Sequence, residues 1–258
     1  MYLEKLKLDG RIAVVTGAGQ GIGAAIAHAL GEAGATVIVT DMNADGVKNS
    51  VDALTTLKIK AHGVVLDVTK SGDVDKICAQ IIKDHGRVDI LVNNAGIARS
   101  LVPAEDNSDE NWRVQMDVNL DGVFWCCRAF GRQMLKQGKG SIVNIGSMSG
   151  IISNKPQEQV AYNASKAAVH HLTRSLAGEW ATRGVRVNAV APTYIETPLV
   201  ANVVGNHQAM FKTWMEMTPM GRMGQPDEIA SVVHFLASDA ASLMTGSIVL
   251  ADGGYCCW

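Results

Sequence analysis

The chain has 258 residues, of which 47% are hydrophobic and 19% are charged. This composition supplies enough apolar side chains for a folded core and argues against a disordered chain. The formal net charge of −2 lacks the basic character of a nucleic-acid-binding surface, so no nucleic-acid partner is expected. No apolar run reaches the ~18 residues that a membrane helix needs, and the N-terminus lacks a signal-peptide core. We therefore expect a soluble cytoplasmic protein without membrane contact.

The cysteines argue against a metal or disulfide framework. They stand singly at Cys78 and as the neighbouring pairs Cys126–Cys127 and Cys256–Cys257. None of these positions has the C-x-x-C spacing of a zinc site or a redox motif. Buried or half-buried free thiols are expected, with no metal bound at the active site.

Short runs rich in Val and Ile alternate with helix-like segments such as 22–34 and 227–241. Several of the runs are almost continuously apolar, as expected for strands that are covered on both faces. The alternation predicts a Rossmann-type, doubly wound α/β fold with seven parallel strands, helices on both faces, and one domain spanning 1–258. The predicted strands are 11–17, 35–41, 61–68, 88–96, 140–147, 185–192 and 246–254.

One long interruption, residues 193–225, separates the sixth strand from the helix that begins near Pro226. Ligands of such sheets bind beyond the carboxyl ends of the strands, so this insertion is predicted to cover a substrate site. Residues 210–223 within it carry five of the chain's eleven methionines. Two interpretations stay open for this segment, an adaptable piece of core and a mobile apolar lid.

A glycine-rich turn, TGAGQGIG, occupies residues 16–23 directly after the first predicted strand. Its glycines follow a G-x-x-x-G-x-G spacing rather than G-x-G-x-x-G. Glycines allow a sharp turn and a close backbone approach to a pyrophosphate, which binds at the positive end of the following helix. The turn predicts a dinucleotide site with contacts at Gly17, Gln20, Gly21, Ile22 and Gly23.

The second predicted strand ends at Asp41, about 20 residues beyond the turn, where a carboxylate would accept hydrogen bonds from an adenosine ribose. A carboxylate there repels a 2′-phosphate, and residues 42–47 contain no Arg or Lys to offset it. This favours NAD over NADP. The alternative is an ordinary Asp that caps a turn at the end of a strand.

Tyr162 and Lys166 lie four residues apart in the segment VAYNASKAAVHHL, residues 160–172. The segment has good helix propensity, and residues at i and i+4 share one helix face. The segment alone does not distinguish a functional phenol–ammonium pair from a chance surface pair.

Five motifs in order decide between these readings. The chain resembles the short-chain dehydrogenase/reductase family over essentially its whole length. The motifs that carry the resemblance are Gly17/Gly21/Gly23, NNAG at 93–96, Asn119 in VNLDG, NIGS at 144–147 and Tyr162-x-x-x-Lys166. Within that family, four segments are similar to bacterial dehydrogenases of galactitol and other polyols. They are VFWCCRAFGRQM, NIGSMSG, TWMEMTPMGRMG and the ending DGGYCCW.

The resemblance implies four catalytic residues. Tyr162 would be the general acid/base, with its pKa lowered by Lys166 and by the positive nicotinamide, and Lys166 would also bind the nicotinamide ribose. Asn119 would hold a water for proton relay, or simply bend a helix. Ser147 and Ser149 both fit the position of the catalytic serine. The NIGS match and the strand end favour Ser147, which would hold the substrate oxygen, leaving Ser149 as a substrate contact.

The remaining cofactor contacts also come from the resemblance. The residues implied are Asp67 and Val68 beside the adenine, Asn93, Ala95 and Gly96 along the cofactor, and Pro192, Ile195 and Thr197 near the carboxamide. In the family NNAG also stabilises the central sheet, so a partly structural role is the alternative for these residues. The chain departs from the family at Thr193, where a glycine usually follows the proline. This difference leaves the local pocket shape undetermined.

The stretch opposite the insertion, SMSGIISNKPQEQ, carries Ser149, Asn154 and Glu158 as expected substrate contacts. Polar groups facing an apolar cover suit a polyhydroxylated chain, such as a polyol, a hexitol or a 1,2-diol, or a small hydroxyketone. We therefore predict an NAD-dependent oxidoreductase that interconverts a secondary alcohol and its ketone. A 3-oxoacyl-carrier-protein reductase or other ketone reductase, and a catalytically silent dinucleotide-binding protein, are the alternatives.

The resemblance further implies a homotetramer built through the helices around 105–135 and 160–182 and the C-terminal strands and tails. The tail ends in Tyr255 and Trp258, large apolar groups that are costly to leave in water. We expect the tail at an interface, with a structural divalent cation near it as a further expectation from the resemblance.

Overall fold

The structure, a computed structural model, describes residues 1–198, 200, 205 and 207–257. Its strands are β1 (Ile12–Thr16), β2 (Thr36–Asp41), β3 (Ala61–Val65), β4 (Ile90–Asn93), β5 (Gly140–Ile145), β6 (Val185–Pro192) and β7 (Ile248–Ala251). The longer helices are α1 (Gly21–Glu32), α2 (Ala44–Thr56), α3 (Ser71–His85), α4 (Asp109–Met116), α5 (Gly122–Gln137), α6 (Val160–Trp180), α8 (Gln208–Met217) and α9 (Pro226–Ala237).

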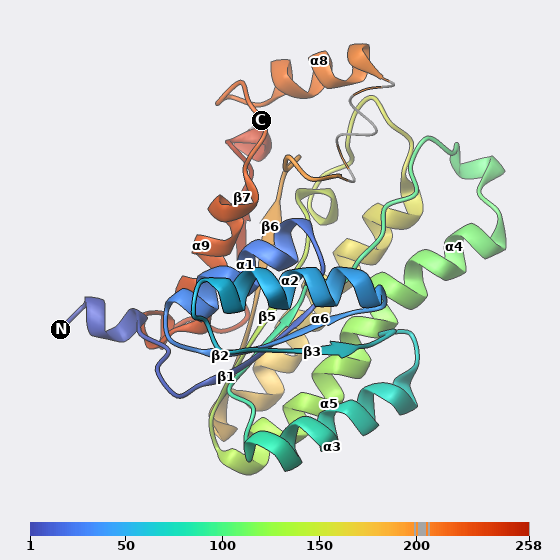
Figure 1. The fold of residues 1–258 in the computed structure, drawn as a ribbon. Coiled ribbons are helices and arrows are strands. Elements are labelled where there is room, and N and C mark those ends of the chain that lie inside the picture. The colour runs from blue at the N-terminus through green and yellow to red at the C-terminus, as the bar shows by residue number, and fades with distance from the viewer. Residues whose placement is uncertain (199, 201–204, 206, 258) are drawn as a thin grey trace.

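The seven strands form one parallel sheet in the order β3-β2-β1-β4-β5-β6-β7 (Figure 1). The chain starts near the centre of the sheet, builds outward to β3, and then returns across β1 to build the other half. The predicted doubly wound fold in a single domain is therefore confirmed. The point between β1 and β4, where the direction of building reverses, is where such sheets bind ligands.

Alternate residues of each strand face opposite helical layers, because successive side chains of a strand point to opposite faces. In β1, Ala13 and Val15 belong to the core beneath α1, α2 and α9. Ile12 and Val14 belong to the core beneath α3, α5 and α6. All four are buried, which explains why this strand is continuously apolar in the sequence.

The strand predicted at 88–96 ends earlier than expected, at Asn93. Beyond it, the backbone N–H groups of Asn94 and Ala95 both donate to the Thr16 hydroxyl, at 3.0 and 3.1 Å. The Asn94 side chain donates to the carbonyls of Thr16 and Gly17, each at 2.9 Å. These bonds turn the NNAG segment across the end of β1 instead of continuing the sheet.

The insertion between β6 and α9 stands partly clear of the sheet. Figure 1 shows α8 beyond the ends of the strands, close to the C-terminal end of the chain. Tyr194 stacks on Trp214 of α8, with centroids 3.8 Å apart, and meets Tyr255 edge-on at 5.8 Å. This aromatic cluster anchors α8 to the tail. Residues 199, 201–204 and 206 of the insertion, and Trp258 of the tail, lie outside the described part of the chain.

Candidate active site

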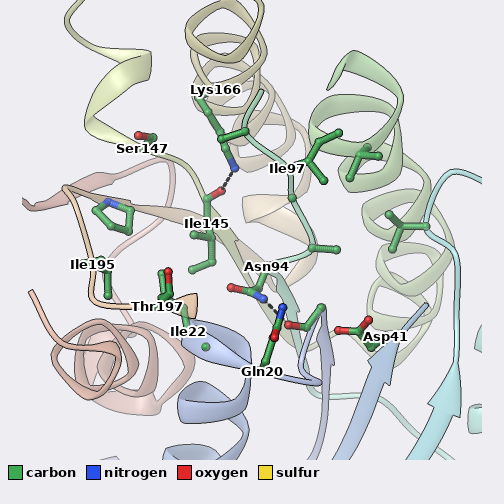
Figure 2. Close-up of a pocket in the computed structure, with 18 of the residues that line it drawn as sticks. Gln20, Ile22, Asp41, Asn94, Ile97, Ile145, Ser147, Lys166, Ile195 and Thr197 are labelled. Atoms are coloured by element: carbon green, nitrogen blue, oxygen red, sulfur yellow. Dashed lines mark hydrogen bonds between the residues drawn. The ribbon is translucent and has the colours of Figure 1, made fainter. Parts of the chain in front are cut away.

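A cleft of about 370 Å³ opens at the carboxyl ends of the central strands. Figure 2 shows it running from Asp41 at one end, past Asn94, to Lys166 and Ser147 at the other. Most of the predicted cofactor and catalytic residues line it together: Gly17, Gln20, Gly21, Ile22, Asp41, Asp67, Val68, Ala95, Gly96, Ser147, Tyr162, Lys166, Pro192, Ile195 and Thr197.

The glycine turn has the geometry that a dinucleotide requires. Gly17 and Gly21 have φ of +62° and +57°, in the left-handed region that side chains disfavour. A Cβ on Gly23 would lie 2.2 Å from the carbonyl oxygen of Gly17, so this glycine lets α1 pack directly under the turn. Gly23 thus supports the cleft from beneath rather than lining it. The turn leaves room for a pyrophosphate at the N-terminus of α1.

Asp41 lies beside the turn, and its carboxylate is held by backbone donors. One oxygen accepts from the Gly19 N–H at 3.0 Å, and the other accepts from the Asn43 N–H at 3.0 Å. Asp41 therefore does cap a turn, as the alternative interpretation held. It also faces the cleft, so the two interpretations are compatible.

Asn93 does not take the cofactor-facing position expected for it. Its side chain is buried, and its amide donates to Asn144 at 2.8 Å and to the Cys127 sulfur at 3.2 Å. Asn94, the first residue beyond β4, lines the cleft instead. The position of Asn94 follows from where β4 ends, which the repeated Asn in NNAG did not reveal.

Lys166 is almost fully buried on α6, and its ammonium donates to the carbonyl oxygen of Ile145 at 2.8 Å (Figure 2). The ammonium lies 5.7 Å from the centre of the Tyr162 ring. Burial lowers the pKa of Lys166 from 10.5 to about 8. The helical spacing thus brings the phenol and the ammonium to the same end of the cleft.

The pKa of Tyr162 differs from the expectation that Lys166 lowers it. Burial raises the pKa of the phenol, and a hydrogen bond with Ser147 opposes the rise only in part. The cost of a buried phenolate outweighs this help. Positive charge beside the phenol would favour its ionised form.

We expect Lys166→Met to stabilise the fold at pH 7 while destroying activity. The pKa of Lys166 is about 8 in the folded chain and 10.5 in the unfolded chain. The unfolded state therefore binds more protons between these pH values, and the free energy of unfolding rises with pH there. Below pH 8 the buried charge costs on the order of 3 kcal/mol. Losing the bond to Ile145 costs about 1 kcal/mol. Calorimetry should therefore show a Tm at pH 7 higher by roughly 5 °C, and a lower Tm would contradict this.

The structure distinguishes the two candidate serines. Ser147 follows the end of β5 and lines the cleft, and its hydroxyl accepts from the Ser149 N–H at 3.1 Å. Ser149 is buried one turn further, where its hydroxyl accepts from Gln159 at 3.2 Å. Of the two serines, Ser147 lines the cleft and Ser149 does not.

Asn119 lies beside the cleft within a π-helical turn, Asp117–Asp121, that joins α4 to α5. It is fully buried. Its oxygen accepts from the Ile97 N–H at 2.8 Å, and its amide donates to the Ile97 carbonyl at 2.9 Å and to Ser165 at 3.1 Å. The side chain therefore fixes the loop after NNAG and the base of α6, and the π-turn shows that the helix is also distorted here.

The predicted polar wall for substrate is largely committed to the protein itself. Asn154 and Gln157 are buried, and their amides donate to the Tyr194 hydroxyl at 3.1 and 3.0 Å. Gln157 also accepts from the Trp214 indole at 3.0 Å. Glu158 is exposed. Neither Asn154 nor Glu158 lines the cleft. Asn154 is held away because a buried amide must find a partner, and its partner Tyr194 lies within the aromatic cluster.

Several cleft residues had not been predicted. Ile97 and Ala98 follow NNAG, and Gly146 and Ile145 precede Ser147, so adjacency to a motif was the available signal. Thr193 lines the cleft where the family carries glycine, and its buried hydroxyl has no hydrogen-bond partner within the described residues. Leu66, Met42, Val118, Pro198 and Val200 complete the wall.

The described residues contain no group of three or more His, Cys, Asp or Glu side chains that could hold a metal ion. The cation expected near the C-terminus therefore gains no support from this part of the chain. Within the same residues, no helix has both the length and the apolar character to cross a membrane.

Comparisons with known proteins agree with this site. A family model of the short-chain dehydrogenases, described as "Enoyl-(Acyl carrier protein) reductase", matches residues 17–256. Galactitol 2-dehydrogenase of Rhizobium johnstonii is 53% identical over 100% of this chain and 99% of its own length. Galactitol 2-dehydrogenase (L-tagatose-forming) of Cereibacter sphaeroides is 48% identical over the same shares. The crystal structure of a gluconate 5-dehydrogenase from Burkholderia cenocepacia in complex with NADP and tartrate superposes with a TM-score of 0.94, at 35% identity, over 100% of both chains.

The chain therefore belongs to the short-chain dehydrogenase/reductase family, as its motifs predicted. It is an oxidoreductase that acts on secondary alcohols and uses a nicotinamide dinucleotide. The closer resemblance to bacterial galactitol dehydrogenases is confirmed, and the interpretation as a 3-oxoacyl-carrier-protein reductase has the weaker support.

Proposed function

We propose that this protein is an NAD-dependent dehydrogenase of polyols, hexitols or 1,2-diols, forming the corresponding ketones. The observation that carries this proposal is the single cleft that holds Asp41 at one end and Ser147, Tyr162 and Lys166 at the other. A dinucleotide bound along it would present its adenosine ribose to Asp41 and its nicotinamide to Tyr162. The test is NADH absorbance with a panel of polyols, diols and mono-ols.

The bound cofactor would accept a hydride from the substrate carbon and add positive charge beside Tyr162. The Tyr162 oxygen takes the hydroxyl proton, and the Ser147 hydroxyl holds the same substrate oxygen. Lys166, already bonded to the Ile145 carbonyl, lends positive charge to the phenolate and would reach the nicotinamide ribose. Asn119 fixes the loop at Ile97 beside Lys166 and would support the proton relay there.

Asp41 supports NAD as the cofactor, although a related solved structure binds NADP. Its carboxylate is held in place by two backbone donors, Gly19 and Asn43. Lys48, the first cation after Asp41, pairs with Asp52 on the exposed side of α2 and does not line the cleft. Asp67 and Val68 lie in the same end of the cleft, where an adenine would rest.

We keep residues 193–225 as the segment that borders the substrate. Its first part supplies Thr193, Ile195, Thr197, Pro198 and Val200 to the cleft wall. The Met-rich part is neither a fully buried piece of core nor a fully exposed lid. Met210 is buried, whereas Met220 is two-thirds exposed. The α8 helix is fastened through Trp214, so we propose that it supports the cover rather than swinging as a lid.

Substrates with a second hydroxyl should be preferred, and this is the prediction for the substrate class. The reactive oxygen must lie within about 3 Å of Tyr162 and Ser147, which places neighbouring hydroxyls toward Thr193 and the turn at Ser149. The Thr193 hydroxyl is buried without a hydrogen-bond partner within the described residues, and a rotation about its χ1 bond would turn it toward one of them in the cleft that Thr193 lines. A site with unmet polar groups penalises a substrate that lacks the matching hydroxyl. We therefore expect kcat/KM for 1,2-hexanediol to exceed that for 2-hexanol by about tenfold or more.

The matched variant for this test is Thr193→Val, which keeps the shape of the side chain and removes its hydroxyl. It should narrow the difference between diol and mono-ol while leaving the mono-ol rate nearly unchanged. Equal efficiency for the two substrates in the wild type would argue against a polyol substrate. Hexitols belong in the same panel as competitors.

We further propose a homotetramer, the assembly expected from the resemblance. Trp112 of α4 and Phe124 of α5 are 37% and 38% exposed, and Leu250 on the edge strand β7 is 42% exposed. Apolar groups gathered on helix and sheet faces favour contact between copies. Sedimentation should show a tetramer at micromolar concentration and smaller species for Phe124→Asp, whereas a wild-type monomer would oppose the proposal.

The tail differs from the expectation that both its aromatic groups lie at an interface. Tyr255 is buried within its own chain against Tyr194, and its hydroxyl donates to the Met217 sulfur at 3.3 Å.

We also keep the cytoplasm as the proposed location, which is supported by the free thiols of Cys78, Cys126 and Cys127.

A further inference from the structure

A third residue of α6, His170, lies directly behind the turn that presents Ser147. It follows Lys166 by four residues and Tyr162 by eight, so all three project from one side of the helix. The imidazole is 96% buried, since its exposed fraction is 4%. The function proposed above assigns it no role.

The ring occupies space that two glycines leave open. A Cβ on Gly146 would lie 2.3 Å from the His170 Nε2, and a Cβ on Gly150 would lie 2.7 Å from its Cε1. Gly146 directly precedes Ser147, and Gly150 is the last residue of the turn Met148–Gly150 that follows it. The imidazole is therefore enclosed by the turn.

A hydrogen bond defines which nitrogen faces the turn. The Ser147 N–H donates to the His170 Nε2 at 3.4 Å. An imidazole nitrogen that accepts carries no proton, so the ring must be neutral with its proton on Nδ1. Burial, together with the positive charges of Lys166 and Arg174, lowers the pKa of His170 to about 4, while a hydrogen bond to the Gly150 backbone partly opposes this. The neutral ring is accordingly the form present near pH 7.

We infer that His170 is a positioning residue, whose neutral imidazole accepts the Ser147 amide and fixes the Ser147 hydroxyl relative to Tyr162. Because Tyr162, Lys166 and His170 share one helix, the helix sets the distance between the general acid/base and the serine. The inference rests on the proposed function for its effect on rate, and on geometry alone for the hydrogen bond. Small displacements of such groups cost rate steeply.

The experiment compares two variants with a control. His170→Leu fills the space without an acceptor, and we expect kcat to fall about ten- to a hundredfold while the Kd for NADH stays within about twofold. His170→Gln places an amide oxygen near the Nε2 position and should restore most of the rate. His171→Leu, at the exposed neighbouring histidine, should match the wild type.

Two further measurements do not depend on turnover. Hydrogen exchange of the peptide covering 146–150 should quicken about tenfold in His170→Leu and stay near wild type in His170→Gln. ¹⁵N NMR of the wild type at pH 7, with the His170 signal identified by its loss in His170→Gln, should show the neutral Nδ1–H tautomer. If the wild type oxidises no alcohol, the proposed function fails, and these two measurements still decide the inference.

Several results would overturn the inference. An Nε2–H tautomer or a charged ring at pH 7 could not accept the Ser147 amide. Unchanged kcat in a folded His170→Leu would show that the bond is dispensable. Equal losses of rate in the Leu and Gln variants would point to packing instead. If His170→Leu does not fold, the tautomer and the Gln variant decide.

Discussion

Replacing Tyr162 with Phe should lower kcat by about a hundredfold or more while leaving the Kd for NADH within a few-fold. The ring of Tyr162 remains to pack against Lys166, whose ammonium lies 5.7 Å from its centre. Only the hydroxyl, and with it the hydrogen bond to Ser147, is removed. Proton transfer and cofactor binding are thereby separated.

The raised pKa of the phenol sharpens this prediction. Burial raises the pKa of the phenol, so the positive charge of NAD⁺ beside it would favour the phenolate that acts as the base in alcohol oxidation. Stopped-flow measurement of proton release on mixing with NAD⁺ should show a signal in the wild type that Tyr162→Phe lacks. Tyr2→Phe, at a residue 89% exposed, is the matched control. Near-normal kcat in Tyr162→Phe would remove Tyr162 from its assigned role.

The second large effect should appear in the choice of cofactor. We expect kcat/KM for NAD⁺ to exceed that for NADP⁺ by more than about tenfold, because the Asp41 carboxylate repels a 2′-phosphate and accepts bonds from the ribose. Asp41→Ser removes the charge and should narrow the difference in kcat/KM between NAD⁺ and NADP⁺, mainly by raising kcat/KM for NADP⁺. It also loses the bond to Gly19, so part of the NAD⁺ efficiency should fall too.

Asp45→Ser is the matched control for net charge, since Asp45 lies four residues further on at the start of α2. It changes the charge of the region without touching the cleft wall, so it should preserve the preference for NAD⁺. Comparable use of both cofactors by the wild type would mean that Asp41 only caps its turn. In that case residues other than Asp41 would have to recognise the ribose 2′-position.

The sequence by itself determined the sheet and the line of the cleft. Buried parallel strands must be apolar on both faces, so β1 and its neighbours were visible as runs of Val and Ile. Gly17 and Gly21 were identifiable because their left-handed backbone tolerates few other residues, and Asp41 because it ends a strand at a fixed distance from them. Tyr162 and Lys166 needed only the helical period to bring them together.

Only the tertiary structure decided which polar groups are free to meet a ligand. Asn93 and Asn154 looked available in the sequence, yet burial committed their amides to Asn144 and Tyr194. Tyr255 belongs to a tail expected at an interface, and its own side chain packs inside its chain. Such outcomes depend on which distant segment supplies a partner, and a pattern of residue types contains no such distances.

The same limit applies to electrostatics and to His170. The resemblance implied that Lys166 and the positive nicotinamide would lower the pKa of Tyr162, whereas burial raises this pKa in the structure, because desolvation depends on every surrounding atom. His170 carried no motif, and its place behind Ser147 came from two glycines 20 and 24 residues earlier. Local periodicity therefore fixed the elements and their faces, whereas packing between elements far apart in the chain fixed the partners and the charges.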